Sequence, residues 1–294
     1  MKKAAIAIGS NSTRLLAAEA EGLTLRSCLR GREETRLFLG LDGHGAITPE
    51  KIEETARAVA RLYHDALSYG ATEVALFATS ATRDATNSDA FAARIKELTG
   101  LTLRIISGEE EARLAFSAAS VGKRRLIMDI GGGSTEWTLG EKNQVEWAVS
   151  MQLGASRLLK IRPIQSPEDA EEILRICRET MQPYARQLRA MRRAPAMVGL
   201  GGTCTTSAAM TMERFASGEQ VEGKLVTLHG AKRQLAYLSS LTLEQRRQVP
   251  GLPPGRVDHM PHGLCILITA LELCGFSYLT ISGKTNLDGY LTQG

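Results

Sequence analysis

The sequence predicts an α/β protein built from two related lobes. Short apolar runs alternate with segments of helical periodicity, which is the pattern of an α/β chain. A ten-residue frame recurs 122 residues further along the chain, which indicates an internal duplication. The length of 294 residues suits about two domains, and a hydrophobic content of 43% is ordinary for a soluble globular protein.

The first half begins with two predicted strands and a capped helix. Ala4–Ile8 is apolar and is followed by a polar turn and a second apolar run from Leu15, which predicts strand, turn and strand. Thr48 and Pro49 have the residue types of an N-cap and a first helical position. Apolar residues at helical spacing then continue to Gly70, so a helix is predicted over this stretch.

Further elements follow in the same alternation. Glu73–Ala78 and Leu101–Ile106 are predicted to be buried strands. Ser166-Pro167 predicts the start of a second capped helix, which Pro183 kinks or ends. His259–His262 lacks the helical spacing of a metal-binding pair and is predicted to be a loop.

The internal repeat sets the domain organisation. Ile6–Leu15 aligns with Met128–Trp137, and both share the frame apolar, x, Ile, Gly, x, x, Ser, Thr, charged, apolar. Each copy lies on a predicted strand–turn–strand near the start of a half-chain. We therefore predict two related lobes, residues 1–122 and 123–280, that share a hinge and a cleft.

A glycine-rich turn in the second copy is the first candidate site. Gly131-Gly132-Gly133-Ser134-Thr135 lies between predicted strands, where successive backbone N–H groups can surround an anion. A bare glycine run is more often only a hairpin turn. Asp129 and Glu136 on either side favour a phosphate cradle with a hard cation such as Mg²⁺.

Two other turns are candidates for phosphate binding. Gly9-Ser10-Asn11-Ser12 has the matching place in the first copy, although a tight turn would look the same. Gly201, Gly202 and Thr203 follow an apolar run at a predicted strand-to-helix junction, where helix N–H groups bind anions. Two nucleotide-binding motifs are excluded. A dinucleotide-binding motif needs its third glycine where Cys204 stands, and a Walker A loop ending at residue 285 needs a glycine where Tyr278 stands.

Charged residues beside two predicted strands are candidates with structural alternatives. Arg83 follows a buried strand, where its guanidinium could bind phosphate through two hydrogen bonds or form a surface ion pair. Glu109, Glu110 and Glu111 begin a predicted helix after Ser107. Acidic residues there ordinarily cap the helix and interact with its dipole, which accounts for the first two.

Composition excludes several classes of protein. A net charge of +4 is mild, and no Lys/Arg run is long enough for a nucleic-acid arm or a membrane-binding patch. The 5 cysteines are scattered and odd in number, which argues against a disulfide framework and for a reducing compartment. The N-terminal apolar stretch is too short for a signal peptide, so we expect a cytoplasmic protein.

Eight motifs in a fixed order resemble the exopolyphosphatase/guanosine pentaphosphate phosphohydrolase (Ppx/GppA) family. They are IGSNSTRLL, LFATSATRDATN, ISGEEEARLAF, LIMDIGGGSTEWTLG, SMQLGASRL, GLGGTCTT, GRVDHMPHG and ISGKTNLDGYL, and they cover nearly the whole chain. The resemblance implies an actin-like ATPase fold of two ribonuclease-H-like domains with an interdomain cleft. It implies that residues 281–294 pack back on the first domain, that this is the short two-domain form, and that a homodimer is compatible with the family.

The same resemblance implies roles for individual residues. Glu111 is similar in place to the family's catalytic base, and Arg83 to a phosphate-binding arginine. Asp129 and Glu136 match the acidic pair that holds Mg²⁺. The three turns match phosphate cradles: Gly9–Ser12, Gly131–Thr135 and Gly201–Thr203.

Two departures from the family pattern affect the expected function. Ala7 stands where the family usually has Asp, and it aligns with Asp129 in the internal repeat; Asp288 stands where arginine is common. We therefore keep three functions open: an exopolyphosphatase, a guanosine pentaphosphate 5′-phosphohydrolase, and a sensor that binds polyphosphate or guanosine tetra- or pentaphosphate without turnover. A sugar or acetate kinase is disfavoured because ISGEEEAR and ATSATRDA match hydrolase motifs.

Overall fold

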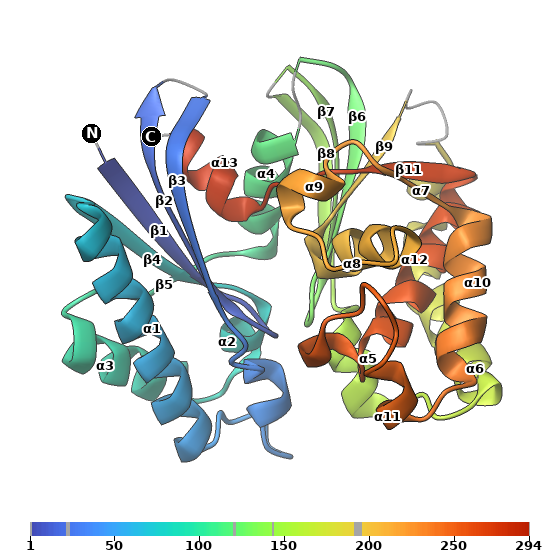
Figure 1. Cartoon of the computed structure of the whole chain (residues 1–294), viewed down its shortest axis with the longest axis horizontal. Coiled ribbons are helices and arrows are strands. Elements are labelled where there is room, and N and C mark those ends of the chain that lie inside the picture. The colour runs from blue at the N-terminus through green and yellow to red at the C-terminus, as the bar shows by residue number, and fades with distance from the viewer. Residues whose placement is uncertain (1, 22–23, 120–121, 143, 191–195, 294) are drawn as a thin grey trace. The chain divides into compact units, whose positions relative to one another are not determined.

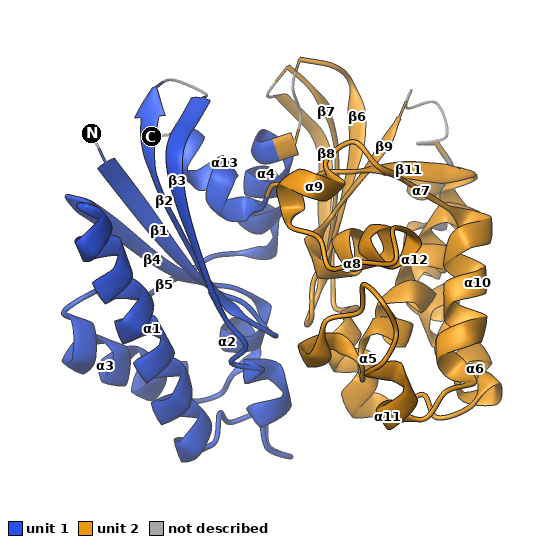
Figure 2. Ribbon diagram, viewed as in Figure 1, with its two compact units in different colours: residues 1–118, 285–294 blue, residues 119–284 orange. Residues whose placement is uncertain are grey.

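The computed structural model describes residues 2–21, 24–119, 122–142, 144–190 and 196–293, and it divides the chain into two units. Unit 1 comprises residues 1–118 and 285–294, and unit 2 comprises residues 119–284 (Figure 2). The elements of unit 1 are β1 (Lys2–Ile8), β2 (Thr13–Glu21), β3 (Thr24–Glu33), η1 (Leu37–Gly40), α1 (Pro49–Tyr69), β4 (Glu73–Ala78), α2 (Ser80–Asp84), α3 (Ser88–Thr99), β5 (Arg104–Ile105), α4 (Gly108–Ala119) and α13 (Asn286–Thr292). Those of unit 2 are β6 (Arg125–Ile130), β7 (Thr135–Glu141), β8 (Gln144–Met151), α5 (Ala155–Ile161), α6 (Pro167–Met181), η2 (Gln182–Tyr184), α7 (Ala185–Ala190), β9 (Met197–Leu200), α8 (Gly201–Thr211), α9 (Gly218–Val221), β10 (Leu225–Thr227), α10 (Leu228–Ser239), α11 (Leu243–Arg246), η4 (Pro254–Arg256), α12 (Met260–Cys274) and β11 (Tyr278–Ile281).

The sheet of unit 1 carries helices on both faces. Its strand order is β3-β2-β1-β4-β5, with β1 antiparallel to β2 and parallel to β4. Side chains alternate along β1, because successive residues of a strand point to opposite faces. Ala4, Ile6 and Ile8 share a core with residues of α1 and α3, whereas Ala5 and Ala7 share one with residues of α4 and α13 (Figure 1).

Local sequence signals explain where α1 begins and ends. The side-chain oxygen of Thr48 accepts a hydrogen bond from Lys51 N–H at 3.4 Å, and Pro49 occupies the first turn. Gly70 ends the helix in the left-handed conformation with φ 92°, which glycine adopts without steric cost. The helix predicted between Thr48 and Gly70 is confirmed.

The sheet of unit 2 is larger, and the described residues of its strands and helices share one hydrophobic core. Its strand order is β10-β11-β9-β6-β7-β8. The very apolar helix α12 is buried along nearly its whole length and packs against α5, α6, α8 and α10. Among the residues that the structure describes, no helix has the length and apolarity needed to cross a membrane.

The predicted hairpin is present in both units and has the same closing hydrogen bond. In unit 1 the N–H of Gly9 donates to the carbonyl oxygen of Ser12 at 3.1 Å. In unit 2 the N–H of Gly131 donates to the carbonyl oxygen of Ser134 at 3.0 Å. The repeated sequence frame therefore folds into the same turn between antiparallel strands twice.

Two predicted elements differ from the structure. The strand predicted over Leu101–Ile106 is shortened to Arg104–Ile105, which pairs with the end of β4. The loop predicted over His259–His262 is wrong, because α12 begins at Met260 with His259 as its N-cap. Pro261 fits there because proline lacks only an N–H that the first turn of a helix leaves unused.

Candidate active site

The turn of the first hairpin is fixed by backbone hydrogen bonds from a later segment. The N–H of Phe38 donates to the carbonyl oxygen of Ser10 at 2.9 Å, and the N–H of Arg36 donates to that of Asn11 at 2.9 Å. Ser10 is buried. Both polar side-chain atoms of Asn11 are buried and have no hydrogen-bond partner among the described residues. The turn is therefore rigid and carries unused hydrogen-bonding groups, as a ligand-binding turn would.

A basic row crosses the sheet of unit 1 just before this turn. Ala7 pairs with Arg14, and Arg14 pairs with Arg32 on the next strand. Burial lowers the pKa of Arg32, the charge of Arg14 lowers it further, and Glu34 opposes the shift. The Nε of Arg14 is buried without a hydrogen-bond partner in the described part of the chain. Like charges opposite one another are destabilising, so this basic row favours an anion.

Arg83 and Glu111 are brought together by two short connections in unit 1. Arg83 lies on α2 and donates through Nη1 to the carbonyl oxygen of Ile106 at 2.8 Å. The same nitrogen lies 3.5 Å from Oε2 of Glu111, in the first turn of α4. The Glu111 residue is only 8% exposed. The surface ion pair considered for Arg83 is thus a half-buried contact with the predicted catalytic carboxylate.

The neighbouring Glu110 of α4 has structural partners. The backbone N–H of Glu110 donates to Oγ of Ser107 at 3.1 Å, and its carboxylate pairs with Arg104. Helix capping and an ion pair therefore account for Glu110.

An acidic row occupies the corresponding place in unit 2. Asp129 pairs with Glu136 across β6 and β7, and Glu136 pairs with Ser150 on β8. Glu136 is buried and accepts a hydrogen bond from Oγ of Ser150 at 2.7 Å. Two facing carboxylates repel one another, and a bound cation would offset that repulsion.

Both glycines at the start of α8 lie close to other groups: Gly201 is blocked by the backbone of Ile130, and a side chain on Gly202 would displace the guanidinium of Arg256. A Cβ on Gly201 would lie 2.4 Å from Oδ1 of Asp129, and Gly201 also has φ +83°. A Cβ on Gly202 would lie 1.6 Å from Nη1 of Arg256. The predicted strand-to-helix junction is confirmed, since β9 ends at Leu200 and α8 begins at the next residue.

Sequence reasoning missed three arginines near these turns. Arg14 is the charged position of the repeated frame, which was an available signal. Arg32 and Arg256 carried no such signal in the sequence. Strand pairing places Arg32 beside Arg14, and the loop before α12 places Arg256 next to Gly202. That the turns of the two units share one cleft stays a prediction.

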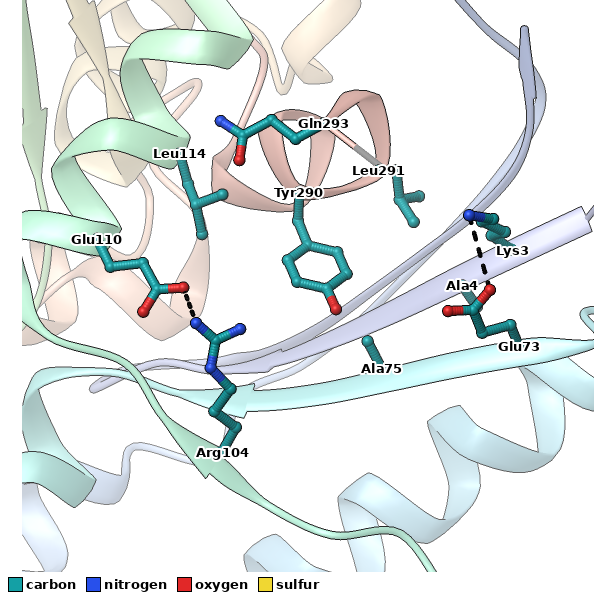
Figure 3. Close-up of a pocket in the computed structure, with 10 residues that line it drawn as sticks. All are labelled: Lys3, Ala4, Glu73, Ala75, Arg104, Glu110, Leu114, Tyr290, Leu291 and Gln293. Atoms are coloured by element: carbon teal, nitrogen blue, oxygen red, sulfur yellow. Dashed lines mark hydrogen bonds and ion pairs between the residues drawn. The ribbon is translucent and has the colours of Figure 1, made fainter. Parts of the chain in front are cut away.

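A separate pocket of about 240 Å³ lies within unit 1 (Figure 3). The ring of Tyr290 forms part of its wall and packs against Phe77, with ring centroids 5.4 Å apart. The residues lining it are Lys3, Ala4, Glu73, Ala75, Arg104, Glu110, Leu114, Tyr290, Leu291 and Gln293. None of these belongs to the predicted site residues.

Several known proteins resemble the chain over its full length. Exopolyphosphatase 2 of Mycobacterium tuberculosis (strain ATCC 25618 / H37Rv) is 33% identical over 97% of this chain and 96% of its own. A bifunctional 3-dehydroquinate synthase/phosphatase of Fusobacterium nucleatum is 28% identical over 99% of this chain and 46% of its own. The crystal structure of the Aquifex aeolicus PPX-GPPA enzyme superposes with a TM-score of 0.83 and 25% identity, covering 100% of this chain and 99% of that one.

These findings define a phosphoric anhydride hydrolase with an actin-like fold of two ribonuclease-H-like domains, and the expected fold is confirmed. The model of the Ppx/GppA phosphatase family matches residues 15–292, and the chain belongs to this family.

Proposed function

We propose that the chain releases terminal orthophosphate from inorganic polyphosphate, with Glu111 as the general base. The observation that carries this proposal is the buried carboxylate of Glu111, 3.5 Å from Arg83, at the first turn of α4. The substrate class is supported by the 33% identity to an exopolyphosphatase. A cytoplasmic location fits this chemistry and is part of the proposal.

The proposed reaction is an in-line displacement by water. Glu111 accepts a proton from water, and the oxygen of that water forms a bond to the terminal phosphorus. The P–O bond to the bridging oxygen breaks, and this oxygen leaves with the shortened chain. Arg83 binds the terminal phosphoryl group, where its charge offsets the negative charge that develops. The products are orthophosphate and a chain that is one phosphate shorter.

The remaining residues would bind the phosphate chain. In unit 1 the turn Gly9–Ser12 would bind phosphate oxygens, and the basic row would neutralise their charge. In unit 2 the amides of Gly132, Gly133 and Ser134, within the turn Gly131–Thr135, and those of the turn Gly201–Thr203 would do so.

The acidic row in unit 2 fits Mg²⁺. The described residues contain no group of three or more His, Cys, Asp or Glu side chains placed to hold a metal. Magnesium usually needs only one or two carboxylates, because waters and substrate phosphates complete its coordination. Asp129 and Glu136 would hold the ion, with Ser150 orienting Glu136. When bound, Mg²⁺ would neutralise charge on the phosphate oxygens.

Orthophosphate release from long-chain polyphosphate tests this function. The wild-type protein is expected to release orthophosphate in Mg²⁺, and EDTA is expected to abolish the release. Glu111→Gln keeps the size of the side chain but removes the base, so its rate should fall to the background level. Equal release by the wild type and Glu111→Gln would overturn the proposal. Guanosine pentaphosphate assayed in parallel decides between the two phosphohydrolase substrates.

A sensor without turnover is the second candidate, and Ala7 favours it. Ala7 is buried and faces Arg14, whereas its counterpart Asp129 faces Glu136. The first hairpin therefore offers an anion only arginine charge and no carboxylate for a metal. Tight binding of polyphosphate or guanosine tetraphosphate by calorimetry, with no orthophosphate release, would support the sensor.

A further inference from the structure

The carbonyl groups of the loop Gly131–Gly133 all point toward the start of α5. The carbonyl oxygen of Gly131 accepts from Ala155 N–H at 3.1 Å. That of Gly132 accepts from the N–H groups of Ser156 at 2.8 Å and Arg157 at 3.0 Å. These hydrogen bonds hold the loop against the start of α5 through its carbonyl oxygens.

The last carbonyl is held by a side chain. Nε of Arg157 donates to the carbonyl oxygen of Gly133 at 2.7 Å, and Nη2 of the same guanidinium donates to Oε1 of Gln152. Because Nε and Nη2 lie on one edge of a planar group, these two contacts fix the orientation of the guanidinium.

The direction of the carbonyls decides the direction of the amides. A trans peptide is planar, so the N–H of each residue points opposite to the carbonyl before it. Tying the carbonyls of Gly131, Gly132 and Gly133 toward α5 therefore turns the amides of Gly132, Gly133 and Ser134 away from α5. These are the amides that the proposed function assigns to phosphate.

Close approach of α5 depends on a glycine. A Cβ on Gly154 would lie 2.3 Å from the carbonyl oxygen of Gly132, so any other residue would push the helix start away from the loop. In unit 1 the corresponding turn is held by the backbone N–H groups of Arg36 and Phe38. In unit 2 the Gly133 carbonyl is instead held by a side chain, which can be exchanged by mutation.

We propose that Arg157 is a positioning residue, which holds the Gly133 peptide so that the Ser134 amide faces the phosphate chain. This proposal rests on the phosphate-binding role proposed for the loop. A peptide free to rotate would present the Gly133 carbonyl oxygen, which repels phosphate, in place of an amide.

Two substitutions distinguish a positioning role of Arg157 from a simple effect of its positive charge. Arg157→Ala removes both contacts, and Arg157→Lys keeps the positive charge but loses the planar edge that makes them. Positioning predicts that both variants weaken binding of tripolyphosphate, measured by calorimetry in EDTA, by about tenfold or more. Arg175→Ala, an exposed arginine paired with Glu172 and Glu179 on α6, is the matched control and should bind like the wild type.

The response to salt and to guanidinium supplies a second readout. A screened charge effect would shrink as salt rises, whereas a mispositioned peptide would keep its binding deficit. Millimolar guanidinium chloride, compared with equal sodium chloride, should partly restore binding to Arg157→Ala but not to Arg157→Lys.

Each outcome decides a separate point. Wild-type affinity in Arg157→Ala, or in Arg157→Lys alone, would overturn the positioning role. A wild-type protein that binds tripolyphosphate in EDTA but releases no orthophosphate from long-chain polyphosphate in Mg²⁺ would overturn the proposed hydrolysis, and the affinities would still decide the role of Arg157. A wild-type protein that binds tripolyphosphate neither in EDTA nor in Mg²⁺ would overturn both proposals. If Arg157→Ala unfolds at a lower urea concentration than the wild type, its affinity is set aside, and the affinity of Arg157→Lys for tripolyphosphate decides the positioning role.

Discussion

Arg83 and Glu111 form a half-buried ion pair in which Nη1 lies 3.5 Å from Oε2. The carbonyl oxygen of Ile106 accepts a hydrogen bond from the same nitrogen at 2.8 Å, so Nη1 of the guanidinium is held between two oxygens. Such a group costs little reorganisation when negative charge develops beside it. The pair thus joins the proposed base to the residue proposed to bind the terminal phosphoryl group.

Replacing Arg83 with lysine should lower turnover more than affinity. Lysine keeps the charge but cannot bind a carbonyl, a carboxylate and a phosphate in one plane. We expect kcat for polyphosphate to fall by about tenfold or more, with a smaller change in KM. Arg94→Lys is the control, because Arg94 pairs with Glu53 and Glu97 on α1 and α3. An unchanged kcat in Arg83→Lys would show that Arg83 does not touch the reacting group.

Restoring the carboxylate at position 7 should raise the rate. Ala7 faces Arg14, so Asp in its place gains an ion-pair partner and offers an oxygen ligand to Mg²⁺. We expect kcat of Ala7→Asp to exceed that of the wild type in Mg²⁺. Ala5→Asp is the control, because Ala5 is buried on the same sheet face but faces Leu16. It should lower the free energy of unfolding by roughly 3 kcal/mol without a gain in rate. No gain at position 7 would show that unit 1 needs no carboxylate there.

Gly201→Ala should damage both stability and activity. Its Cβ would lie 2.4 Å from Oδ1 of Asp129 and 2.5 Å from the backbone carbonyl oxygen of Ile130, at a φ of +83° that disfavours any other residue. Gly223→Ala is the control, since Gly223 has φ +73° but nothing within 4 Å of its Cβ. In urea unfolding the control should lose about 1 kcal/mol. Gly201→Ala should lose more than that and should also release less orthophosphate. Equal losses in the two variants would contradict the close contact with Asp129.

His262 should make the protein less stable in mild acid. Burial lowers the pKa of His262 from 6.5 to about 4, although its Nε2 lies 2.8 Å from the carbonyl oxygen of Arg162. Between these pH values the unfolded chain binds a proton that the folded chain does not. The contribution is therefore complete above pH 6.5 and is lost as the pH falls toward 4, by roughly 3 kcal/mol in all. His262→Gln keeps an N–H donor but does not titrate, so its unfolding free energy should fall less over this range. Parallel pH curves for the two proteins would contradict the prediction.

Local signals in the sequence were enough for the elements that carry the proposed turns. The Thr48–Gly70 helix follows from cap residues and apolar spacing, and the two hairpins follow from the repeated frame around Gly9 and Gly131. Such elements depend mainly on residues that are near one another in the chain. The strand around Arg104 was overestimated, because only two residues find a partner on β4.

Contacts between distant segments could not be predicted from the sequence. Asp288 departs from the family pattern, and in the structure its carboxylate accepts a hydrogen bond at 2.6 Å from Nη2 of Arg30, which lies 258 residues away in the sequence. The Arg157 contact with Gly133 depends in the same way on the reversal of the chain after β8. Neither pair has a spacing that marks it in the sequence.

The role of Glu111 as the general base is tested most directly by measuring polyphosphate binding and polyphosphate turnover separately. Wild type and Glu111→Gln, from matched preparations, would be titrated with polyphosphate by calorimetry and assayed for orthophosphate release in Mg²⁺. The account predicts that the variant binds polyphosphate with an affinity close to that of the wild type, while its turnover falls by about a hundredfold or more. A variant that releases orthophosphate as fast as the wild type would contradict it.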